Sequence, residues 1–374
     1  MASELERRVL ITGGAGFIGS NLAAFLLQNT NARVRILDNL SRRGVELNVQ
    51  WLRNLARDSD RLQLIAGDVR NADTVTAACD GVSEIYHLAA QVAVTTSVDD
   101  PRGDFAVNAM GTLNVLEAAR ALPRKPMLLF TSTNKVYGAL DTLTVQTGPR
   151  RCFVADAGFR GVSEETPLDF HSPYGCSKGA ADQYVRDYAR IYGLPTVVFR
   201  MSCICGPRQF GTEDQGWVAH FLYSVLSGRQ INIYGDGKQV RDVLHVDDLI
   251  AAMQAAREHL PATRGEVYNV GGGMERAVSV LEILSRIEQQ TGKSCSCSHG
   301  EMRPGDQPLY ITDFSKLTRD TQWQPRRSVE QTLADITKFW NVNRDLIGRP
   351  RMPALITEVP GSGVLVSGAK EQVA

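Results

Sequence analysis

The amino-acid sequence predicts an α/β fold: a Rossmann-type, doubly wound parallel sheet with a smaller C-terminal substrate-binding lobe. Short runs of β-branched and apolar residues alternate with longer helical patterns through the first two-thirds of the chain. A glycine-rich turn joins the first run to the first helical stretch, and loop-like sequence replaces the alternation from about residue 205. Such alternation is typical of parallel sheets that carry helices on both faces.

The strands of this sheet are expected where short runs have the length and β-branched content of buried strands. These runs lie at residues 8–12, 33–38, 62–66, 84–88, 127–131 and 196–200, and a later run at Glu266–Val270 is expected to add one more strand. Helical stretches occupy residues 17–27, 112–121 and 177–191.

The chain is expected to divide into two interleaved lobes. Residues 1–204 form the Rossmann domain, to which a segment at about 241–272 returns. Segments 205–240 and 273–340 form the substrate-binding lobe, with a helix at Trp217–Leu226 between loop-like stretches. Residues 341–374 are predicted to be a loose tail, because the end of the chain is rich in Gly, Pro, Ser and Val without helical period.

Composition excludes several classes of partner. Lys+Arg and Asp+Glu balance at 41 each among 374 residues, so no overall field favours nucleic acid or an anionic membrane. The N-terminus lacks an apolar signal core, and no apolar run reaches the ~18–20 residues of a membrane span. The seven cysteines, an odd number spread along the chain, fit reduced thiols better than a disulfide framework. We therefore expect a cytoplasmic protein.

The glycine-rich turn predicts a dinucleotide site. The first strand runs directly into Gly13-Gly14-Ala15-Gly16-Phe17-Ile18-Gly19 and then into an apolar helix. The glycines permit the tight turn, let the backbone approach a pyrophosphate and allow the helix to pack closely on the strand. A purely structural role for the glycines is disfavoured by this strand–turn–helix setting. The predicted contacts from the turn are Gly13, Gly16, Phe17, Ile18 and Gly19.

Asp38 indicates which dinucleotide binds. It ends the second strand about 20 residues beyond the turn, where a carboxylate binds the adenosine ribose hydroxyls and repels a 2′-phosphate. The sequence thus favours NAD over NADP, although Arg42 and Arg43 follow closely and leave NADP open. Further contacts are expected at the ends of the next strands, from Asn39, Asp68, Val69, Leu88, Ala89 and Ala90.

Tyr174, Lys178 and Thr133 are the candidate catalytic residues. Tyr174 precedes Lys178 by four residues near a helix start, so both side chains share one helix face. A lysine cation beside a tyrosine favours the phenolate, and lowering the tyrosine pKa from ~10 by about three units would give a usable base. Thr133 follows the fifth strand, where parallel sheets bind ligands.

With these residues the chain resembles the extended short-chain dehydrogenase/reductase family of nucleotide-sugar epimerases and dehydratases. The resemblance covers roughly residues 8–340 and includes the G-x-x-G-x-x-G spacing of the turn. The segments most similar to the CDP-sugar 2-epimerases of this family are residues 132–138, 169–182, 208–210, 214–217 and 237–245.

The resemblance implies an epimerase that uses NAD. Tyr174 would take a proton from a sugar hydroxyl as hydride leaves its carbon, and Thr133 would hydrogen-bond the reacting oxygen. Lys178 would bind the nicotinamide ribose and lower the pKa of Tyr174, which makes both residues cofactor contacts as well. The keto-sugar would turn over and receive hydride on its other face. The implied substrate is a CDP-linked 6-deoxyhexose that is inverted at C2.

Related activities remain as alternatives. The 4,6-dehydratases of the family carry an Asp-Glu pair after the catalytic threonine, and Asn134 and Lys135 stand there instead, which disfavours a dehydratase. A 4-epimerase or decarboxylase of a UDP-sugar stays open, as does a non-catalytic NAD-binding sensor. The presence of Thr133, Tyr174 and Lys178 argues against the sensor.

The resemblance also assigns substrate contacts. Arg241 and Arg303 match family positions that bind the nucleotide, and arginine suits a diphosphate because its donors are forked. Arg208 is a weaker candidate for binding the nucleotide. The other expected substrate contacts are Thr133, Asn134 and Cys203. Cys203 stands where many members have an asparagine, and Cys205 replaces a usual tyrosine. Asn108 matches a family asparagine near the catalytic tyrosine, as a cofactor contact or a structural residue.

No metal is expected. Cys295, Cys297 and His299 alternate along the chain, but structural zinc sites generally use four ligands, often with C-x₂₋₄-C spacing. Family members commonly dimerise through two helices, which in this chain would be residues 112–121 and 177–191. A homodimer or higher homo-oligomer is therefore expected.

Overall fold

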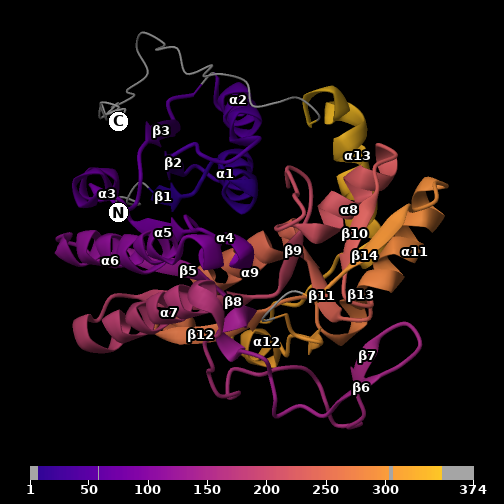
Figure 1. Cartoon of the computed structure of the whole chain (residues 1–374). Coiled ribbons are helices and arrows are strands. Elements are labelled where there is room, and N and C mark those ends of the chain that lie inside the picture. The colour runs from indigo at the N-terminus through magenta and orange to yellow at the C-terminus, as the bar shows by residue number, and fades with distance from the viewer. Residues whose placement is uncertain (1–6, 58, 303–305, 348–374) are drawn as a thin grey trace.

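A computed structural model describes residues 7–57, 59–302 and 306–347 (Figure 1). Its centre is a seven-stranded sheet in the order β12-β8-β5-β4-β1-β2-β3, and all of these strands pair in parallel. The predicted fold class is confirmed. The strands are β1 (Arg8–Thr12), β2 (Arg33–Asp38), β3 (Leu62–Ala66), β4 (Glu84–His87), β5 (Met127–Thr133), β8 (Thr196–Met201) and β12 (Glu266–Val270).

Helices cover both faces of this sheet because successive strand residues point to opposite sides. Val9 and Ile11 of β1 pack into one core, and Leu10 between them packs into the other. The first core lies under α1 (Phe17–Asn29), α2 (Val45–Ala56) and α9 (Val246–Glu258). The second lies under α3 (Ala72–Cys79), α6 (Gly111–Ala121) and α7 (Ser172–Tyr192). Helix α6 follows the short α4 (Val94–Asp99), α5 (Pro101–Phe105) and η1 (Ala106–Met110).

A second lobe has its own small sheets and core. Strand β11 pairs with β13, β15 and β9, while β10 pairs with β14. Helices α8, α11 and α13 enclose a separate apolar cluster on this lobe, which lies beside the large sheet in Figure 1. The elements are β9 (Cys203–Cys205), α8 (Trp217–Leu226), β10 (Ile231–Tyr234), β11 (Val240–His245), β13 (Ala277–Ser279), α11 (Val280–Thr291), β14 (Cys297–Gly300), β15 (Leu309–Tyr310) and α13 (Val329–Ile347).

Smaller elements connect the two lobes. A turn, η2, follows β5, and the hairpin β6–β7 projects beside β13 and β11. Helix α9 packs on α1, and β12 joins the edge of the large sheet, whereas β11 pairs only within the small sheets of the described chain. The remaining elements are η2 (Asn134–Tyr137), β6 (Val145–Thr147), β7 (Cys152–Val154), α10 (Leu260–Thr263), η3 (Met274–Arg276) and α12 (Ser315–Thr321).

Helix α13 corrects the predicted start of the tail. Residues 341–347 continue this helix instead of forming a loose end, because Ile336, Phe339 and Ile347 bury apolar side chains in the second core. Residues 348–374 lie outside the described residues. In the described part of the chain, no helix is long and apolar enough to cross a membrane.

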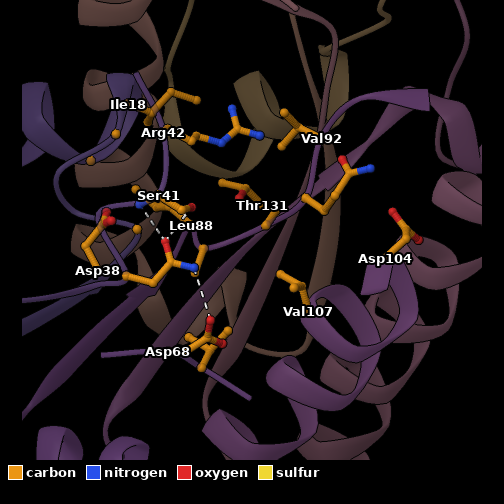
Figure 2. A pocket seen from close by; sticks show the side chains of 18 of the residues that line it. Ile18, Asp38, Ser41, Arg42, Asp68, Leu88, Val92, Asp104, Val107 and Thr131 are labelled. Carbon is orange, nitrogen blue, oxygen red and sulfur yellow. Dashed lines mark hydrogen bonds between the residues drawn. The ribbon is translucent and has the colours of Figure 1, made fainter. Parts of the chain in front are cut away.

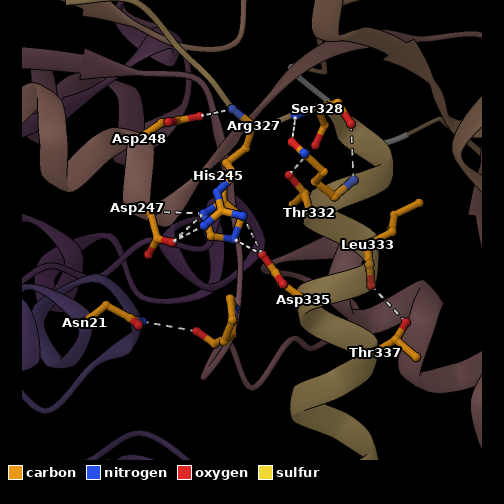
Figure 3. A network of polar contacts seen from close by, with 12 residues as sticks. Asn21, His245, Asp247, Asp248, Arg327, Ser328, Thr332, Leu333, Asp335 and Thr337 are labelled. Atoms are coloured by element: carbon orange, nitrogen blue, oxygen red, sulfur yellow. Dashed lines mark hydrogen bonds and ion pairs between the residues drawn. The ribbon is translucent and has the colours of Figure 1, made fainter.

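A polar network fastens the start of α13 to the strand–helix junction of β11 and α9 (Figure 3). His245 lies between Asp247 and Asp335, with each ring nitrogen 3.5 Å from a carboxylate oxygen. The Asp248 carboxylate accepts hydrogen bonds from the backbone N–H groups of Arg326 and Arg327. These contacts hold the last helix against the segment that links the lobes.

Helix α7 is fixed to the large sheet by a buried ion pair. The Arg200 guanidinium of β8 donates two hydrogen bonds of 2.9 Å to the Asp182 carboxylate, and the side chains are 3% and 0% exposed. Arg200 also donates to the Tyr137 hydroxyl at 3.0 Å, which donates to Asn269 of β12 at 2.7 Å. The bidentate geometry fixes the helix in rotation as well as in position.

Replacing Asp182 by Asn should destabilise the fold strongly, because the Arg200 charge would remain buried without its counterion. Breaking such a pair costs about 3–5 kcal/mol, measurable as the change in the free energy of unfolding in urea. Asp60→Asn is the matched control, since its ion pair with Arg33 is exposed and is worth about 0–1 kcal/mol. Equal losses in both variants would contradict the role given to the buried pair.

Candidate active site

Two cavities meet at Tyr174, which lines both of them together with Val92. The first, here called the glycine-loop cavity, has a volume of about 460 Å³ and lies at the carboxyl ends of the sheet strands beside Gly13–Gly19. The second, the lobe cavity, has a volume of about 700 Å³ and lies between Thr133 and the second lobe. Parallel sheets bind ligands at this edge.

The glycine turn is shaped for a close backbone approach. Gly13 has φ +70°, and a Cβ there would lie 2.7 Å from the Ala89 nitrogen. A Cβ on Gly19 would lie 2.4 Å from the Gly13 carbonyl oxygen, so only glycine lets α1 begin this close to the turn. The start of α1 thereby faces the cavity, as a phosphate-binding helix requires.

Carboxylates line the glycine-loop cavity, with Asp38 and Asp68 on one side and Asp104 on the other (Figure 2). Asp38 accepts hydrogen bonds from the backbone N–H groups of Ala15 and Leu40 at 3.0 and 2.8 Å. Burial raises the pKa of Asp38 above its ordinary value, and these hydrogen bonds oppose the rise. For Asp68, burial is outweighed by hydrogen bonds from Arg70 and Asn39, which lower its pKa to about 2.

Most of the predicted cofactor residues come together at this cavity. Those that line it are Gly13, Gly16, Phe17, Ile18, Gly19, Asp38, Asn39, Asp68, Val69, Leu88, Ala89, Ala90, Tyr174 and Lys178. Asn108 does not line it. Its buried amide donates to the Gln91 carbonyl, Asp104 and Ser177, and accepts from the Gln91 N–H. Asn108 therefore supports the cavity wall from behind, in line with the structural alternative.

Sequence reasoning missed several polar residues of this cavity, among them Gln91, Asp104 and Gln215. Asp104 accepts a hydrogen bond from Ser177 of α7. Gln215 accepts one from Arg42, and the two residues are 173 positions apart in the chain. No local spacing signals such contacts, because they form only when distant segments pack.

Tyr174 is a buried phenol, 8% exposed. Burial raises its pKa to about 12, while a hydrogen bond with Thr133 and the charge of Arg42 act in the opposite direction. Its backbone N–H donates to the Ser97 hydroxyl at 3.1 Å, which fixes the first turn of α7. Helix α7 starts at Ser172, five residues before the predicted helical stretch, so Tyr174 lies inside the helix.

Lys178 does not offset the burial of Tyr174 in this structure. Its ammonium donates to the Thr131 carbonyl at 2.5 Å and lies 4.1 Å from the centre of the Phe130 ring. Burial lowers the pKa of Lys178 to about 7, although Asp182 and Asp104 oppose this. The sequence predicted that Lys178 lowers the pKa of Tyr174. In the protein without bound ligands, the pKa of Tyr174 is raised instead.

The lobe cavity carries two cationic side chains on its wall. Arg241 donates to the Asp306 carboxylate at 2.5 Å, and the Lys135 ammonium lies 3.3 Å from the same oxygen. Thr133, Asn134 and Cys203 also line this cavity, so it brings together most of the predicted substrate contacts. Arg303 lies outside the described residues.

Arg208, predicted as a substrate contact, lines neither of these two cavities. Its guanidinium stacks 3.5 Å from the centre of the Trp51 ring and donates to Asn48 at 3.3 Å. It also lies 5.6 Å from the ring of Phe339 on α13. The flat guanidinium thus ties α2 to α13. Among the described residues, no three His, Cys, Asp or Glu side chains are placed to hold a metal ion.

Comparisons with known proteins agree with this geometry. The family described as GDP-mannose 4,6 dehydratase matches residues 10–336. The chain is 42% identical to CDP-paratose 2-epimerase of Salmonella typhi, over 86% of this chain and 96% of that protein. It is 32% identical to UDP-glucose 4-epimerase of Mycolicibacterium smegmatis, over 89% of this chain and 98% of that protein.

Solved structures give the same picture. UDP-glucuronic acid 4-epimerase from Bacillus cereus, in complex with UDP-glucuronic acid and NAD, superposes with a TM-score of 0.77 at 30% identity, covering 90% of this chain and 99% of that chain. The dTDP-glucose 4,6-dehydratase DesIV from Streptomyces venezuelae, with NAD bound, has a TM-score of 0.77 at 28% identity, covering 90% of this chain and 98% of that chain.

The buried ammonium of Lys178 predicts a pH-dependent stability. Its folded pKa of about 7 lies below the ordinary 10.5, so the unfolded chain binds more protons between these values and stability rises with pH across that window. The slope from this group is about 1.4 kcal/mol per pH unit. Urea unfolding from pH 7 to 10 should show a rise that Lys178→Met lacks.

Lys338→Met is the matched control, because Lys338 is exposed on α13. This variant should keep the pH profile of the original protein. A difference between the original protein and Lys178→Met that does not change with pH would contradict the assignment.

Proposed function

Because the chain belongs to the GDP-mannose 4,6-dehydratase family of extended short-chain dehydrogenases/reductases, we propose that it is an NAD-dependent nucleotide-sugar epimerase. Its proposed reaction is the inversion of C2 of CDP-paratose to give CDP-tyvelose. The observation that carries this proposal is the position of Tyr174, which lines both cavities where they meet, while Thr133 lines the lobe cavity beside it. The identity with the Salmonella enzyme supports the choice of sugar.

The glycine-loop cavity fits NAD. Gly13 and Gly19 leave no room for a Cβ, which suits a pyrophosphate against the backbone. Asp38 borders the same cavity and suits a ribose without a 2′-phosphate. The contacts predicted from the sequence are proposed to hold NAD, with Asn108 as support. When bound, NAD supplies an acceptor that takes a hydride from the sugar and returns it.

The chain's own residues handle the proton and the orientation of the sugar. Tyr174 takes the proton of the reacting hydroxyl and gives it back, while Thr133 holds the same oxygen. With a pKa near 12 in the protein alone, Tyr174 is a base only once the site is filled. Lys178, fixed by the Thr131 carbonyl, is proposed to bind the ribose of the nicotinamide.

The lobe cavity fits the nucleotide sugar. Arg241 and Lys135 offer cationic donors for a diphosphate, and Trp217 and Phe221 offer apolar surface. Asn134 donates to Gln307 at 3.2 Å and Lys135 contacts Asp306. Neither Asn134 nor Lys135 carries a carboxyl group. The acid–base pair that water elimination needs is therefore missing at these positions, which disfavours a dehydratase. Arg303 is proposed as a further contact on sequence grounds.

A second candidate is a 4-epimerase or decarboxylase of a UDP-sugar. It is favoured by the relatives and neighbours that act at C4, and it would use the same first oxidation. A non-catalytic NAD sensor is disfavoured, because Tyr174 lines both cavities and Thr133 lines the lobe cavity, so the catalytic residues are assembled where the two cavities meet.

We also propose a homodimer through α6 and α7, in the cytoplasm. Large apolar side chains are exposed on α7 and its neighbours α5 and η1, where Ile191 is 66%, Phe105 53% and Tyr184 52% exposed. Apolar surface gathered in this way marks an interface.

The reaction is tested by incubating the protein with CDP- and UDP-sugars in D2O and following the sugars by NMR. We expect inversion at C2 of CDP-paratose, without net NADH and without deuterium at the inverted carbon, because hydride returns directly. Deuterium at that carbon would refute hydride return, and inversion only at C4 of a UDP-sugar would select the second candidate.

Tyr174→Phe should lower kcat by about 10²–10⁴-fold, the usual contribution of a general base. Tyr192→Phe is the matched control, because Tyr192 lies at the far end of the same helix, and it should keep full activity. Full activity in Tyr174→Phe would defeat the assignment of the base.

The dimer is tested by sedimentation velocity. Ile191→Glu should shift the protein from dimer to monomer, because burying an unpaired carboxylate in the interface is costly. Val342→Glu places the same charge at an exposed apolar position of α13 and should leave the dimer intact. A monomeric original protein would refute this interface.

A further inference from the structure

Two thiols lie together on strand β9, at the wall of the lobe cavity. The Sγ atoms of Cys203 and Cys205 are 3.6 Å apart. Residues two apart in a strand point to the same side, and the parallel pairing of β9 with β11 fixes this alternation. The proposed epimerisation uses neither sulfur as a nucleophile.

The two sulfurs have unequal surroundings. Cys203 lines the lobe cavity, and its sulfur accepts a hydrogen bond from the Trp217 indole at 3.1 Å. Cys205 is 0% exposed. The hydrogen bond with Cys203, followed by burial, raises the pKa of Cys205 well above its ordinary value. Cys205 therefore keeps its proton, and Cys203 is the sulfur that a small oxidant reaches first.

We propose that Cys203 and Cys205 form a dithiol site that a peroxide converts reversibly into a disulfide, and that this change alters the wall of the lobe cavity. Cα atoms two residues apart in a strand are separated by roughly 6.6 Å, which lies within the range of about 4.4–6.8 Å for disulfides. The spacing is near the upper end of that range, so the bond should be readily reduced.

The oxidation balances with one peroxide. An S–O bond forms on Cys203 as the O–O bond breaks, which gives a sulfenic acid and one water. The sulfur of Cys205 then attacks that of Cys203, the S–O bond breaks, and a second water leaves with the Cys205 proton. Two thiols lose two electrons and two protons in total, and a dithiol reductant restores them.

Trp217 links the proposed disulfide to the wall of the lobe cavity. This residue begins α8, and its indole donates to the Cys203 sulfur. Drawing that sulfur toward Cys205 removes the acceptor of the indole and changes the cavity wall. If the lobe cavity holds the nucleotide sugar, as proposed above, the disulfide lowers the affinity for that ligand.

Tryptic mass spectrometry after treatment with hydrogen peroxide tests the bond directly. Residues 201–208 form one tryptic peptide that contains Cys203 and Cys205 and no other cysteine. We expect this peptide to become lighter by two hydrogen atoms and to recover its mass with dithiothreitol. A dimedone adduct or higher oxidation there, without loss of the two hydrogens, would overturn the proposal.

The chain contains its own control for spacing. Cys295 and Cys297 are also two residues apart and lie alone in the tryptic peptide 294–316. The pKa of Cys297 is raised by burial, although its side chain is exposed at the surface. In the described part of the chain no hydrogen bond joins these two sulfurs, and the Cys295 sulfur contacts the Leu284 carbonyl instead, so this peptide should stay reduced. Equal disulfide formation in both peptides would show that the contact on β9 has no special effect.

Variants separate the two steps. In Cys205→Ala, peroxide should leave a sulfenic acid on Cys203 that dimedone traps, whereas Cys203→Ala should leave the peptide unchanged at the same peroxide dose. Oxidation of the original protein should also change the tryptophan fluorescence, and Trp217→Phe should abolish that change. A disulfide that forms without any fluorescence change would overturn the proposal that oxidation alters the wall of the lobe cavity. None of these measurements depends on the substrate.

Discussion

A buried ion pair between Asp182 and Arg200 determines where the candidate catalytic residues lie. Helix α7 carries Tyr174 and Lys178 in its first two turns, and the bidentate contact fixes this helix against β8. The network continues through Tyr137 to Asn269, so β8, β12 and η2 share the same anchor. Hydrophobic packing alone would leave the helix free to rotate by small amounts, whereas two directed hydrogen bonds would not.

The strands were predictable because β-branched runs of five or six residues in a parallel sheet are apolar on both faces. Helix ends were harder to place. Helix α7 begins at Ser172, with Pro173 in its first turn, where proline is favoured but resembles a loop signal in the sequence. Residues 341–347 are helical because their apolar side reaches a core that the sequence pattern did not reveal.

The residues of the candidate site also divide into those that the sequence predicts and those that it does not. The residues of the glycine turn were predictable, since one local segment makes both the turn and the helix start. The Gln215 contact and the placement of Arg208 were not, because each depends on segments more than 150 positions apart. Spacing correctly placed Tyr174 and Lys178 on one helix, but it could not supply the burial that governs their pKa values.

The contact between Arg42 and Gln215 has a consequence for how the cofactor is used. It closes one side of the glycine-loop cavity with a segment whose neighbours, Asp214 and Gly216, border the lobe cavity. A redox-neutral inversion needs the same dinucleotide for both hydride transfers. If the reduced dinucleotide dissociated between them, the keto-sugar intermediate could not be reduced back. Closure from the sugar side suits a resident prosthetic group, kept through many turnovers, better than a co-substrate that exchanges in every cycle.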